Sequence, residues 1–510
     1  MIILTTEQLY KAHHDTIEKQ QISELELIER AGLQVFNWIH SRMQGSQVKI
    51  HLFNGIGNNG AVGLVLARHL LINGYNIDNY VVNFSKKRTS AFLANYDRVK
   101  ELKSWPVLIT ETDNFPKEIG DDDIIIDAIF GIGLNKDTGG LVNSLFTFLN
   151  SIKAFKLAID IPSGLHADKT VDLNHVLKVN YTLTFQSPKL VFFLPETAVF
   201  TEQWEVLDIG LEQSLLQVED APQLISKHEV LPLYRMREKF SNKFSYGHAL
   251  MIGGSFGKIG AMHLSSKAAL KTGCGLVSAY MPKCGVTILQ SSFAEAMVQV
   301  GSGDELLADI TPKGNFNAIG FGMGMGTASE TVDGVTAFLK ENKVPLVIDA
   351  DGLNILSQNT ELLKSIPEES VLTPHKRELE RLIGSWNNDF EMLQKVCLFS
   401  EEHNCIVVIK DAVTFTVYKT KVFINTSGNP ALATAGSGDV LTGMVASLIA
   451  QGYTNLDAAI VAVYLHGRTA DVAVEETGYQ SFVASDSINN IGKAYLDMFK
   501  KPEAQVEEVQ

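Results

Sequence analysis

The clearest chemical signature in the chain surrounds Asp439, which follows Gly436, Ser437 and Gly438 at the start of an apolar helical stretch. Free backbone amides at such a helix N-terminus form an anion site, and the helix dipole adds to it. A carboxylate among these amides is unsuited to binding phosphate. It is suited to removing a proton from a substrate hydroxyl during phosphoryl transfer. The alternative, that Asp439 only balances the dipole in the first helical turn, is less favoured given the whole stretch 425–443.

A second set of polar residues lies in the first half of the chain. A glycine loop at 54–63 follows a predicted strand and opens a predicted helix, a position that suits phosphate, although a tight turn without a ligand needs similar glycines. Asp127 ends a second apolar run, and Asp160 and Ser163 end a third. Because the carboxyl ends of parallel strands share one rim, these residues are expected to converge with Asn59. Their oxygens suit a hard cation, whereas either aspartate alone would more often be a helix cap.

Parallel sheets are needed to position both sets. Short apolar runs alternate with helical stretches, which indicates parallel strands covered on both faces. Thr5 to Gln8 and Ser23 to Glu26 fit capping boxes that start the first two helices. We therefore predict a Rossmann-like α/β domain at 1–211, a polar linker at 212–228 and a second α/β domain at 229–510, with a frayed tail from Lys500. The predicted strands are 48–53, 80–84, 124–129, 157–161, 181–185, 248–252, 276–281, 318–320, 344–349, 370–373, 406–410 and 422–425.

Composition limits the classes of partner. The 510 residues include 43 basic and 58 acidic side chains, a net charge of −15 that argues against binding nucleic acid or an anionic membrane. Small anionic ligands stay possible. The N-terminus lacks the pattern of a signal peptide and no apolar run reaches the length of a membrane span, so a cytoplasmic location is expected. None of the 4 cysteines forms a Cys-x-x-Cys pair, which favours buried, reduced thiols.

The motifs of the first half resemble the NAD(P)H-hydrate epimerase domain over nearly all of 1–211. The resemblance rests on the sequences at 27–32, 54–63, 127–133 and 160–164. It implies that Asn59, Asp127 and Ser163 hold K⁺, and Asp160 is our candidate for the acid–base residue. The residues that it places against the hydrated nucleotide are Asn58, Asn59, Gly60, Ala61, Val62, Gly131, Ile132, Gly133, Leu134, Asn135, Lys136, Asp137 and Asp160.

The second half resembles the ribokinase-like superfamily through its Gly-Ser-Gly-Asp motif. The sequences at 253–261, 320–324, 349–354, 373–378 and 410–414 narrow the resemblance to the ADP/ATP-dependent NAD(P)H-hydrate dehydratase domain, over about 229–495. ADP or ATP would be the phosphoryl donor, and Asp349 and Asn354 could organise Mg²⁺ through water. The residues implied to contact the hydrate are Ala261, Gly324, His375 and Asp439, and those implied to hold the nucleotide are Lys410, Asp411, Ala412, Val413, Thr414, Gly436, Ser437 and Gly438.

Taken together, the two halves resemble the bifunctional NAD(P)H-hydrate repair enzymes. The first would interconvert the R and S hydrates of NADH and NADPH, and the second would dehydrate the S hydrate at the expense of a nucleotide. We expect these small molecules as partners and a homo-oligomer as the assembly. Departures from the family patterns are Val62 for an aspartate, Lys376 and Arg377 for Pro-Gly, Asp411 for a glycine, and Phe321 and Met323 for Pro and Leu.

Three alternatives stay open at this point. Val62 cannot ligate a cation or accept a hydrogen bond, so the first domain could be impaired or only bind its ligand. The second domain could be a small-molecule kinase that releases a phosphorylated product. The chain could also be a non-catalytic nucleotide-binding protein. His13 and His14 are interpreted as a solvated helix face rather than as part of a site.

Overall fold

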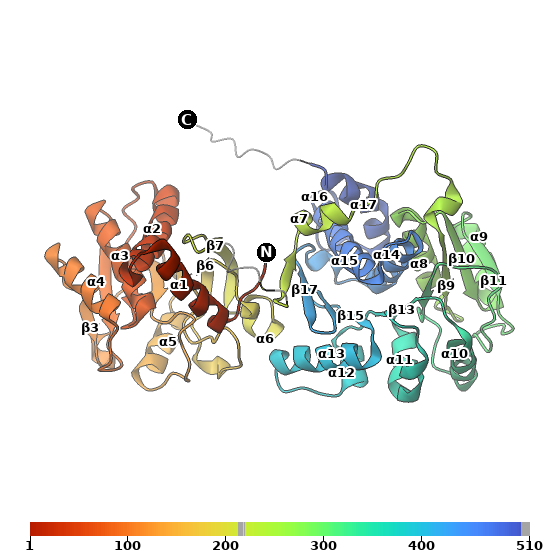
Figure 1. The fold of residues 1–510 in the computed structure, drawn as a ribbon, viewed down its shortest axis with the longest axis horizontal. Coiled ribbons are helices and arrows are strands. Elements are labelled where there is room, and N and C mark those ends of the chain that lie inside the picture. Colours follow the sequence, from red (N-terminus) through yellow and green to blue (C-terminus); the bar gives the residue numbers. More distant parts are fainter. Residues whose placement is uncertain (213–217, 219, 501–510) are drawn as a thin grey trace. The chain divides into compact units, whose positions relative to one another are not determined.

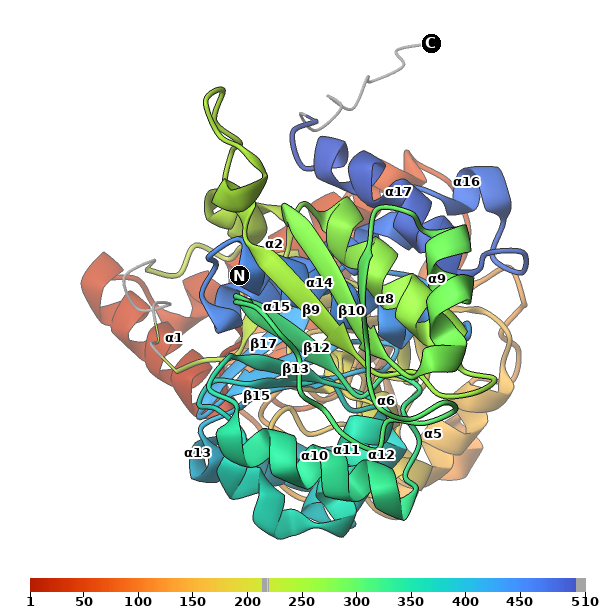
Figure 2. The same cartoon turned by 90° about the vertical axis from the view of Figure 1, so that its right-hand side faces the viewer.

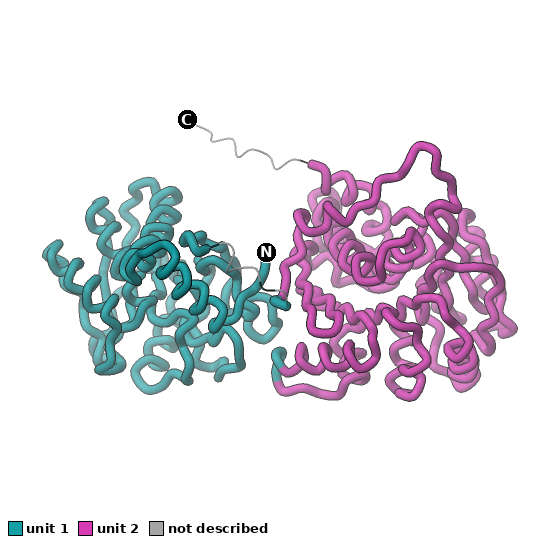
Figure 3. Tube along the Cα trace, viewed as in Figure 1, with its two compact units in different colours: residues 1–221, 388–390 teal, residues 222–387, 391–510 magenta. Residues whose placement is uncertain are grey.

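The computed structural model describes residues 1–212, 218 and 220–500. The chain forms two compact units, the first of residues 1–221 and 388–390 and the second of 222–387 and 391–510 (Figure 3). The expected linker at 212–228 falls partly on 213–217 and 219, outside the described residues, and its later part is a strand and a short helix instead. The expected frayed tail lies outside the described residues from 501 onward.

Unit 1 is built on a seven-stranded, wholly parallel sheet in the order β3-β2-β1-β4-β5-β6-β7 (Figure 1). The chain adds β2 and β3 on one side of β1 and then β4 on the other, so the strand order reverses between β1 and β4. Ligands bind at such switch points in open α/β sheets. The elements are α1 (Thr6–Gln20), α2 (Glu24–Met43), β1 (Ile50–Asn54), α3 (Asn58–Ile72), β2 (Ile77–Val82), α4 (Ser90–Glu101), β3 (Val107–Ile109), β4 (Ile124–Ala128), α5 (Leu141–Ser151), β5 (Phe155–Ile159), β6 (Val179–Phe185), α6 (Pro195–Ala198) and β7 (Thr201–Leu207).

Two apolar layers cover this sheet. One contains α2, α3 and α4 with residues such as Leu52 and Ile126, and the other contains α5 with Phe53 and Ile125. Neighbouring residues of one strand enter opposite layers because side chains alternate along a strand. Both expected capping boxes are present, at Thr5 before α1 and at Ser23 before α2.

Unit 2 contains a ten-stranded sheet in the order β11-β10-β9-β12-β13-β14-β15-β16-β17-β8, antiparallel only at β15–β16 and β16–β17. Its order reverses between β9 and β12. Figure 2 shows α8, α14 and α15 on one face and α10 to α13 on the other. The elements are β8 (Gln223–Ile225), α7 (Lys227–Val230), β9 (His248–Ile252), α8 (Ile259–Thr272), β10 (Leu276–Met281), α9 (Val286–Ser292), β11 (Met297–Val300), β12 (Ala318–Phe321), α10 (Ser329–Glu341), β13 (Leu346–Ile348), α11 (Asp351–Gln358), β14 (Val371–Leu372), α12 (Lys376–Ile383), α13 (Asp389–His403), β15 (Ile406–Ile409), β16 (Phe415–Tyr418), β17 (Lys421–Asn425), α14 (Ser437–Ala450), α15 (Asn455–Asp471), α16 (Val474–Thr477) and α17 (Ala484–Asp497).

The prediction of two α/β domains on parallel sheets is therefore confirmed. The 4 cysteines are free, with Cys274 and Cys405 buried and Cys284 and Cys397 partly exposed. In the part of the chain that the structure describes, no helix combines the length and apolar character that a membrane crossing requires.

Candidate active sites in the two units

In unit 1, a pocket of about 1070 Å³ opens at the carboxyl ends of β1, β4 and β5, next to the switch point. The predicted residues that line it are Asn58, Asn59, Val62, Gly131, Ile132, Gly133, Leu134, Asn135, Lys136, Asp137 and Asp160. Gly60 and Ala61 are buried and are not among its lining residues. A Cβ atom on Gly60 would lie 1.9 Å from the Gly55 carbonyl oxygen, so this glycine lets the loop fold back on itself.

Gly131 shows how tightly the pocket residues converge. A Cβ atom at this position would lie 2.9 Å from Asp160 Oδ2 and 3.3 Å from the Asn59 side chain. Any other residue would push these two polar side chains apart. The loop after β4 therefore has glycine where it passes between the N-terminus of α3 and the end of β5.

Asp160 is held in an unusual backbone conformation, with φ of +72°. Its Oδ2 accepts a hydrogen bond from the Ile132 amide at 3.0 Å, and its Oδ1 lies 3.3 Å from Lys189 Nζ. Non-glycine residues in the left-handed region cost energy and often occur at functional sites. The geometry keeps the carboxylate fixed at the pocket wall, where it can exchange a proton with a bound hydroxyl.

Lys189 was not identified from the sequence. It is 1% exposed, and it donates to Thr184 Oγ1 at 2.8 Å and to the Ser187 carbonyl at 2.8 Å in addition to pairing with Asp160. Burial lowers the pKa of Lys189, and the negative charge of Asp160 opposes that effect. The signal in the sequence that could have identified Lys189 is its position, only four residues after a continuous apolar strand.

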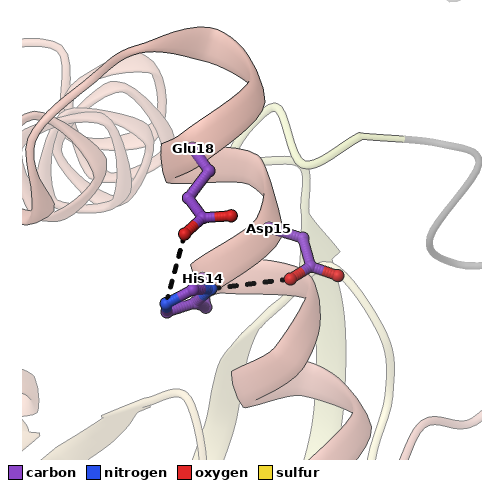
Figure 4. Close-up of side chains that lie close together, drawn as sticks. All are labelled: His14, Asp15 and Glu18. Carbon is purple, nitrogen blue, oxygen red and sulfur yellow. Dashed lines mark ion pairs between the residues drawn. The ribbon is translucent and has the colours of Figure 1, made fainter.

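The interpretation of His13 and His14 as a solvated helix face is wrong for His13. Its side chain lines the pocket from α1 together with Tyr10, and burial lowers its pKa while the charge of Asp160 raises it. His14 lines the same pocket, but its side chain is 70% exposed and pairs with Asp15 and Glu18 on the surface of α1 (Figure 4). The helical pattern of the sequence predicts that both histidines lie on α1, but it does not reveal the pocket next to this helix.

Asp127 and Ser163 form a hydrogen-bonded pair just beneath the pocket. Asp127 is 1% exposed and accepts hydrogen bonds from Ser163 Oγ at 2.6 Å and from the Ser163 amide at 2.8 Å. Asn59 is connected to Ser163 because both bond to the backbone of Phe130. Burial raises the pKa of Asp127 to about 6, and among the described residues no cationic side chain pairs with it. Three donors, the Ser163 hydroxyl and the Ser163 and Ile129 amides, hold this carboxylate. A buried carboxylate without a cationic partner can also attract a monovalent cation.

In unit 2, Asp439 lies in the first turn of α14. This helix begins directly after its N-cap residue Gly436, which has a φ of +87°. Burial raises the pKa of Asp439 to about 7, and the charges of Asp349 and Asp351 add to this rise, while Lys410 opposes it. A group with a pKa near neutrality can both accept and release a proton at physiological pH.

Asp349 and Lys410 form an ion pair beside this helix. Lys410 Nζ lies 2.6 Å from Asp349 Oδ1, and Thr442 donates to Asp349 Oδ2 at 3.1 Å. A Cβ atom on Gly438 would lie 3.0 Å from Lys410 Nζ and 3.1 Å from Asp349 Oδ2. The structure thus brings the predicted nucleotide residues Lys410 and Gly438 together. Asn354 instead bonds Asp351 and Arg381, so it is not grouped with Asp349.

The remaining predicted residues of unit 2 are found at four places. Gly324, with φ of +61°, lies next to Ala261, since its Cβ would be 3.4 Å from the Ala261 Cβ. His375 caps α12, its Nδ1 accepting from the Arg377 and Glu378 amides. Asp411 to Thr414 connect β15 and β16, and Ser437 bonds buried His466.

Two further charged residues of this region belong to the motifs at 349–354 and 373–378 but were given no role of their own. Asp351 Oδ2 accepts from the Gly326 amide at 2.8 Å and lies 3.3 Å from Lys258 Nζ. Glu378 is 6% exposed, and its pKa is raised by burial and by Asp349 and lowered by Lys410. Acidic side chains therefore gather more densely here than the sequence indicated.

Comparisons with known proteins match both halves of the chain. A family model described as NAD(P)H-hydrate dehydratase matches residues 249–493, and one described as YjeF-related protein N-terminus matches 24–191. A bifunctional NAD(P)H-hydrate repair enzyme of Moorella thermoacetica is 31% identical over 96% of this chain and 96% of its own length. This chain belongs to the bifunctional NAD(P)H-hydrate repair enzyme family. Repair enzymes of the same name from Coxiella burnetii and Thermofilum pendens are 31% and 30% identical, over 91% and 94% of this chain and 93% of each relative.

As a member of this family, the chain has the bifunctional epimerase and dehydratase function of NAD(P)H-hydrate repair. The predicted function is confirmed, and neither an impaired or binding-only first domain nor a small-molecule kinase is favoured. Among solved structures, an ADP/ATP-dependent NAD(P)H-hydrate dehydratase from Bacillus subtilis, co-crystallised with ATP/Mg²⁺, is 24% identical, with a TM-score of 0.46 and coverage of 54% of this chain and 98% of that chain.

Proposed function

We propose that the pocket of unit 1 is the epimerase site and that Asp160 is its acid–base residue. The observation that carries this proposal is the convergence of Asp160, Asn59 and Gly131 at the wall of a pocket of about 1070 Å³. The amides of the loop after β4 and the N-terminus of α3 would bind the phosphates of the nucleotide. Val62 is 5% exposed and lines the same wall, where it would provide an apolar contact.

In unit 2, Asp439 would act as general base. It takes the proton of the ring hydroxyl, the oxygen attacks the terminal phosphoryl group of the nucleotide, and the nucleotide with one phosphate fewer leaves. Loss of phosphate from carbon and of a proton from the neighbouring carbon then restores the reduced nicotinamide ring. The amides of Gly436, Ser437 and Gly438 would stabilise the charge on the phosphoryl group. Ala261, Gly324 and His375 would surround the hydrate, and 410–414 the nucleotide.

ADP is the proposed donor, with ATP as the alternative, and Mg²⁺ would be held through water beside Asp349. A divalent cation would suit this site because the charges of Asp349 and Asp351 raise the pKa of Asp439, so three carboxylates lie within electrostatic reach of one another. Lys410 pairs with Asp349, and Lys258 pairs with Asp351. Bound Mg²⁺ would offset charge on the transferring phosphoryl group.

The direct test supplies the purified chain with pure S hydrate of NADH and either ADP or ATP. Return of the reduced-nicotinamide absorbance with release of one phosphate per turnover is expected, faster with ADP. Recovery with ATP alone would overturn the donor assignment. Recovery without either nucleotide would overturn the phosphoryl-transfer mechanism.

Lys410→Met is expected to raise the KM for the nucleotide by about tenfold, the equivalent of one lost charge contact of about 1.4 kcal/mol. Because Lys410 lowers the pKa of Asp439, its removal should also move the rise of the rate with pH to higher values. Steady-state kinetics at several pH values measure both effects. Lys419→Met, an exposed lysine between β16 and β17, is the matched control. An unchanged nucleotide KM in Lys410→Met would contradict this assignment.

Replacing K⁺ by tetramethylammonium is expected to slow the conversion of R to S hydrate severalfold, since Asn59, Asp127 and Ser163 would lose their cation. Asp127→Asn should make the remaining rate insensitive to K⁺. Asp123→Asn is the control, because this carboxylate lies just before β4 and pairs with His51 rather than with the pocket. Chromatographic separation of the epimers follows the reaction. Equal rates in both salts would argue against a K⁺ site.

A further inference from the structure

The chemistry of epimerisation poses a geometric problem in the unit 1 pocket. Water adds to a reduced nicotinamide at the ring carbon next to nitrogen, because that carbon of the enamine becomes electrophilic once its neighbour is protonated. The hydroxyl oxygen on this carbon changes sides when one epimer becomes the other. A single fixed group that reaches the oxygen in one epimer does not reach it in the other, so two proton carriers are needed.

One carrier is Asp160, and both oxygens of its carboxylate are held in place. The Ile132 amide holds Oδ2, Lys189 holds Oδ1, and the backbone is locked at φ of +72°. Lys189 is itself held by Thr184 in β6 and by the Ser187 carbonyl after it. This carboxylate cannot follow an oxygen that moves to the other side of the ring.

The pocket contains a second suitable group on a different element. His13 lines it from α1, while Asp160 lines it from the end of β5. The Tyr10 and His13 rings meet edge to face at 6.3 Å, and the Tyr10 hydroxyl lies next to Gly133, which places this part of α1 against the loop after β4. Asp160 and Lys189 both influence the titration of His13, so the three groups lie within electrostatic reach of one another.

We propose that His13 is the second proton carrier of the epimerase half and works as a pair with Asp160. This rests on the proposed placement of the hydrate in the unit 1 pocket. Asp160 takes the hydroxyl proton, the bond from carbon to ring nitrogen breaks with its electron pair moving to nitrogen, and a carbon–oxygen double bond forms. While the ring is open, the proton passes from Asp160 to His13. Nitrogen then attacks the other face of the carbonyl carbon, and the oxygen takes the proton from His13.

The sequence of steps is balanced without any co-reactant. The proton that leaves the first epimer is the one that returns to the second, and the pair ends with an ionised Asp160 and a neutral His13. Burial lowers the pKa of His13, which favours the neutral imidazole between turnovers. In the reverse direction the two residues exchange roles.

His13→Ala in the full-length chain tests this assignment, with Lys11→Ala as the control, because Lys11 is an exposed residue of α1 that does not line the pocket. Pure R hydrate is supplied without nucleotide, so that unit 2 cannot consume the S epimer as it forms. The kcat of His13→Ala is expected to fall by roughly 10²-fold or more, as for loss of an acid–base group, with KM changed by less than about threefold. Added imidazole should restore part of the rate in His13→Ala only. Lys11→Ala should match the wild type.

Several outcomes would overturn the proposal. They are an unchanged kcat in His13→Ala, an equal loss in both variants, or a loss that imidazole leaves unchanged although R hydrate still binds. If His13→Ala fails to bind R hydrate, His13→Gln, which preserves side-chain bulk, is measured instead, and a wild-type kcat in that variant also overturns it. A wild-type chain that does not convert R hydrate would refute the epimerase function itself, which distinguishes that failure from failure of the His13 assignment alone.

Discussion

Asp439→Asn is expected to lower the rate of S hydrate dehydration by roughly 10²–10⁴-fold, because asparagine cannot accept the proton of the ring hydroxyl. Nucleotide binding should persist, since the amides of α14 and Lys410 are untouched. The wild-type rate should rise about tenfold per pH unit below pH 7 and level off above it, because Asp439 must be ionised and its pKa is raised to about 7. Stopped-flow absorbance and calorimetric titration of the nucleotide measure the two properties.

The stability of unit 2 provides an independent readout. A carboxyl whose pKa is higher in the folded chain than in the unfolded one destabilises the fold increasingly as pH rises between the two values, and constantly above the higher one. Asp439→Asn removes this ionisation, so the Tm of unit 2 at pH 8 should stay equal or rise. Asp457→Asn, an aspartate in the first turn of α15, is the control and should keep full activity. Near-wild-type turnover in Asp439→Asn would remove Asp439 from the mechanism.

Asp160→Asn is expected to reduce R to S conversion by at least about 10²-fold while dehydration of the S hydrate proceeds at the wild-type rate. Asparagine is the suitable replacement because it tolerates a positive φ better than most residues do. The change leaves the buried Lys189 without its counter-charge, which typically costs about 3–5 kcal/mol. Epimer chromatography without nucleotide and a thermal melt measure these two effects.

A double variant separates the loss of chemistry from the loss of stability. Asp160→Asn with Lys189→Met removes both charges, so it should regain much of the lost Tm but none of the epimerase rate. Lys156→Met serves as the control for Lys189, because it is a buried lysine of unit 1 whose ammonium group bonds backbone carbonyls after α5. Recovery of epimerisation in the double variant would show that Asp160 acts only through stability.

Residues at strand ends were predictable from the sequence, and residues that approach from other elements were not. Asp127, Asp160 and Asp439 each follow a continuous apolar run or open an apolar helix, and parallel topology gathers such positions at one rim of a sheet. His13 belongs to a helix far away in sequence, and Lys189 follows a strand to which no motif pointed. Their places depend on the packing of α1 and on the turn after β6, which local patterns do not encode.

The departures from the family patterns have partial explanations in the fold. Phe321 is 1% exposed and stacks on Phe338, so it fills space in the core beneath the switch point. Met323 is fully buried as well. Arg377 supplies a backbone amide to the cap formed by His375, which any residue except proline can do. Nothing in the structure explains Asp411.

The helix that carries Asp439 has consequences for motion during turnover. Residues from Val440 to Ala450 are buried, Thr442 ties the helix to Asp349 at the end of β13, and Ser437 ties its first turn to His466. A helix clamped in this way stays still while ligands enter and leave. We expect rearrangement on the microsecond-to-millisecond scale to occur in exposed connections such as 411–412, so that this segment rather than the base would set the rate of nucleotide release.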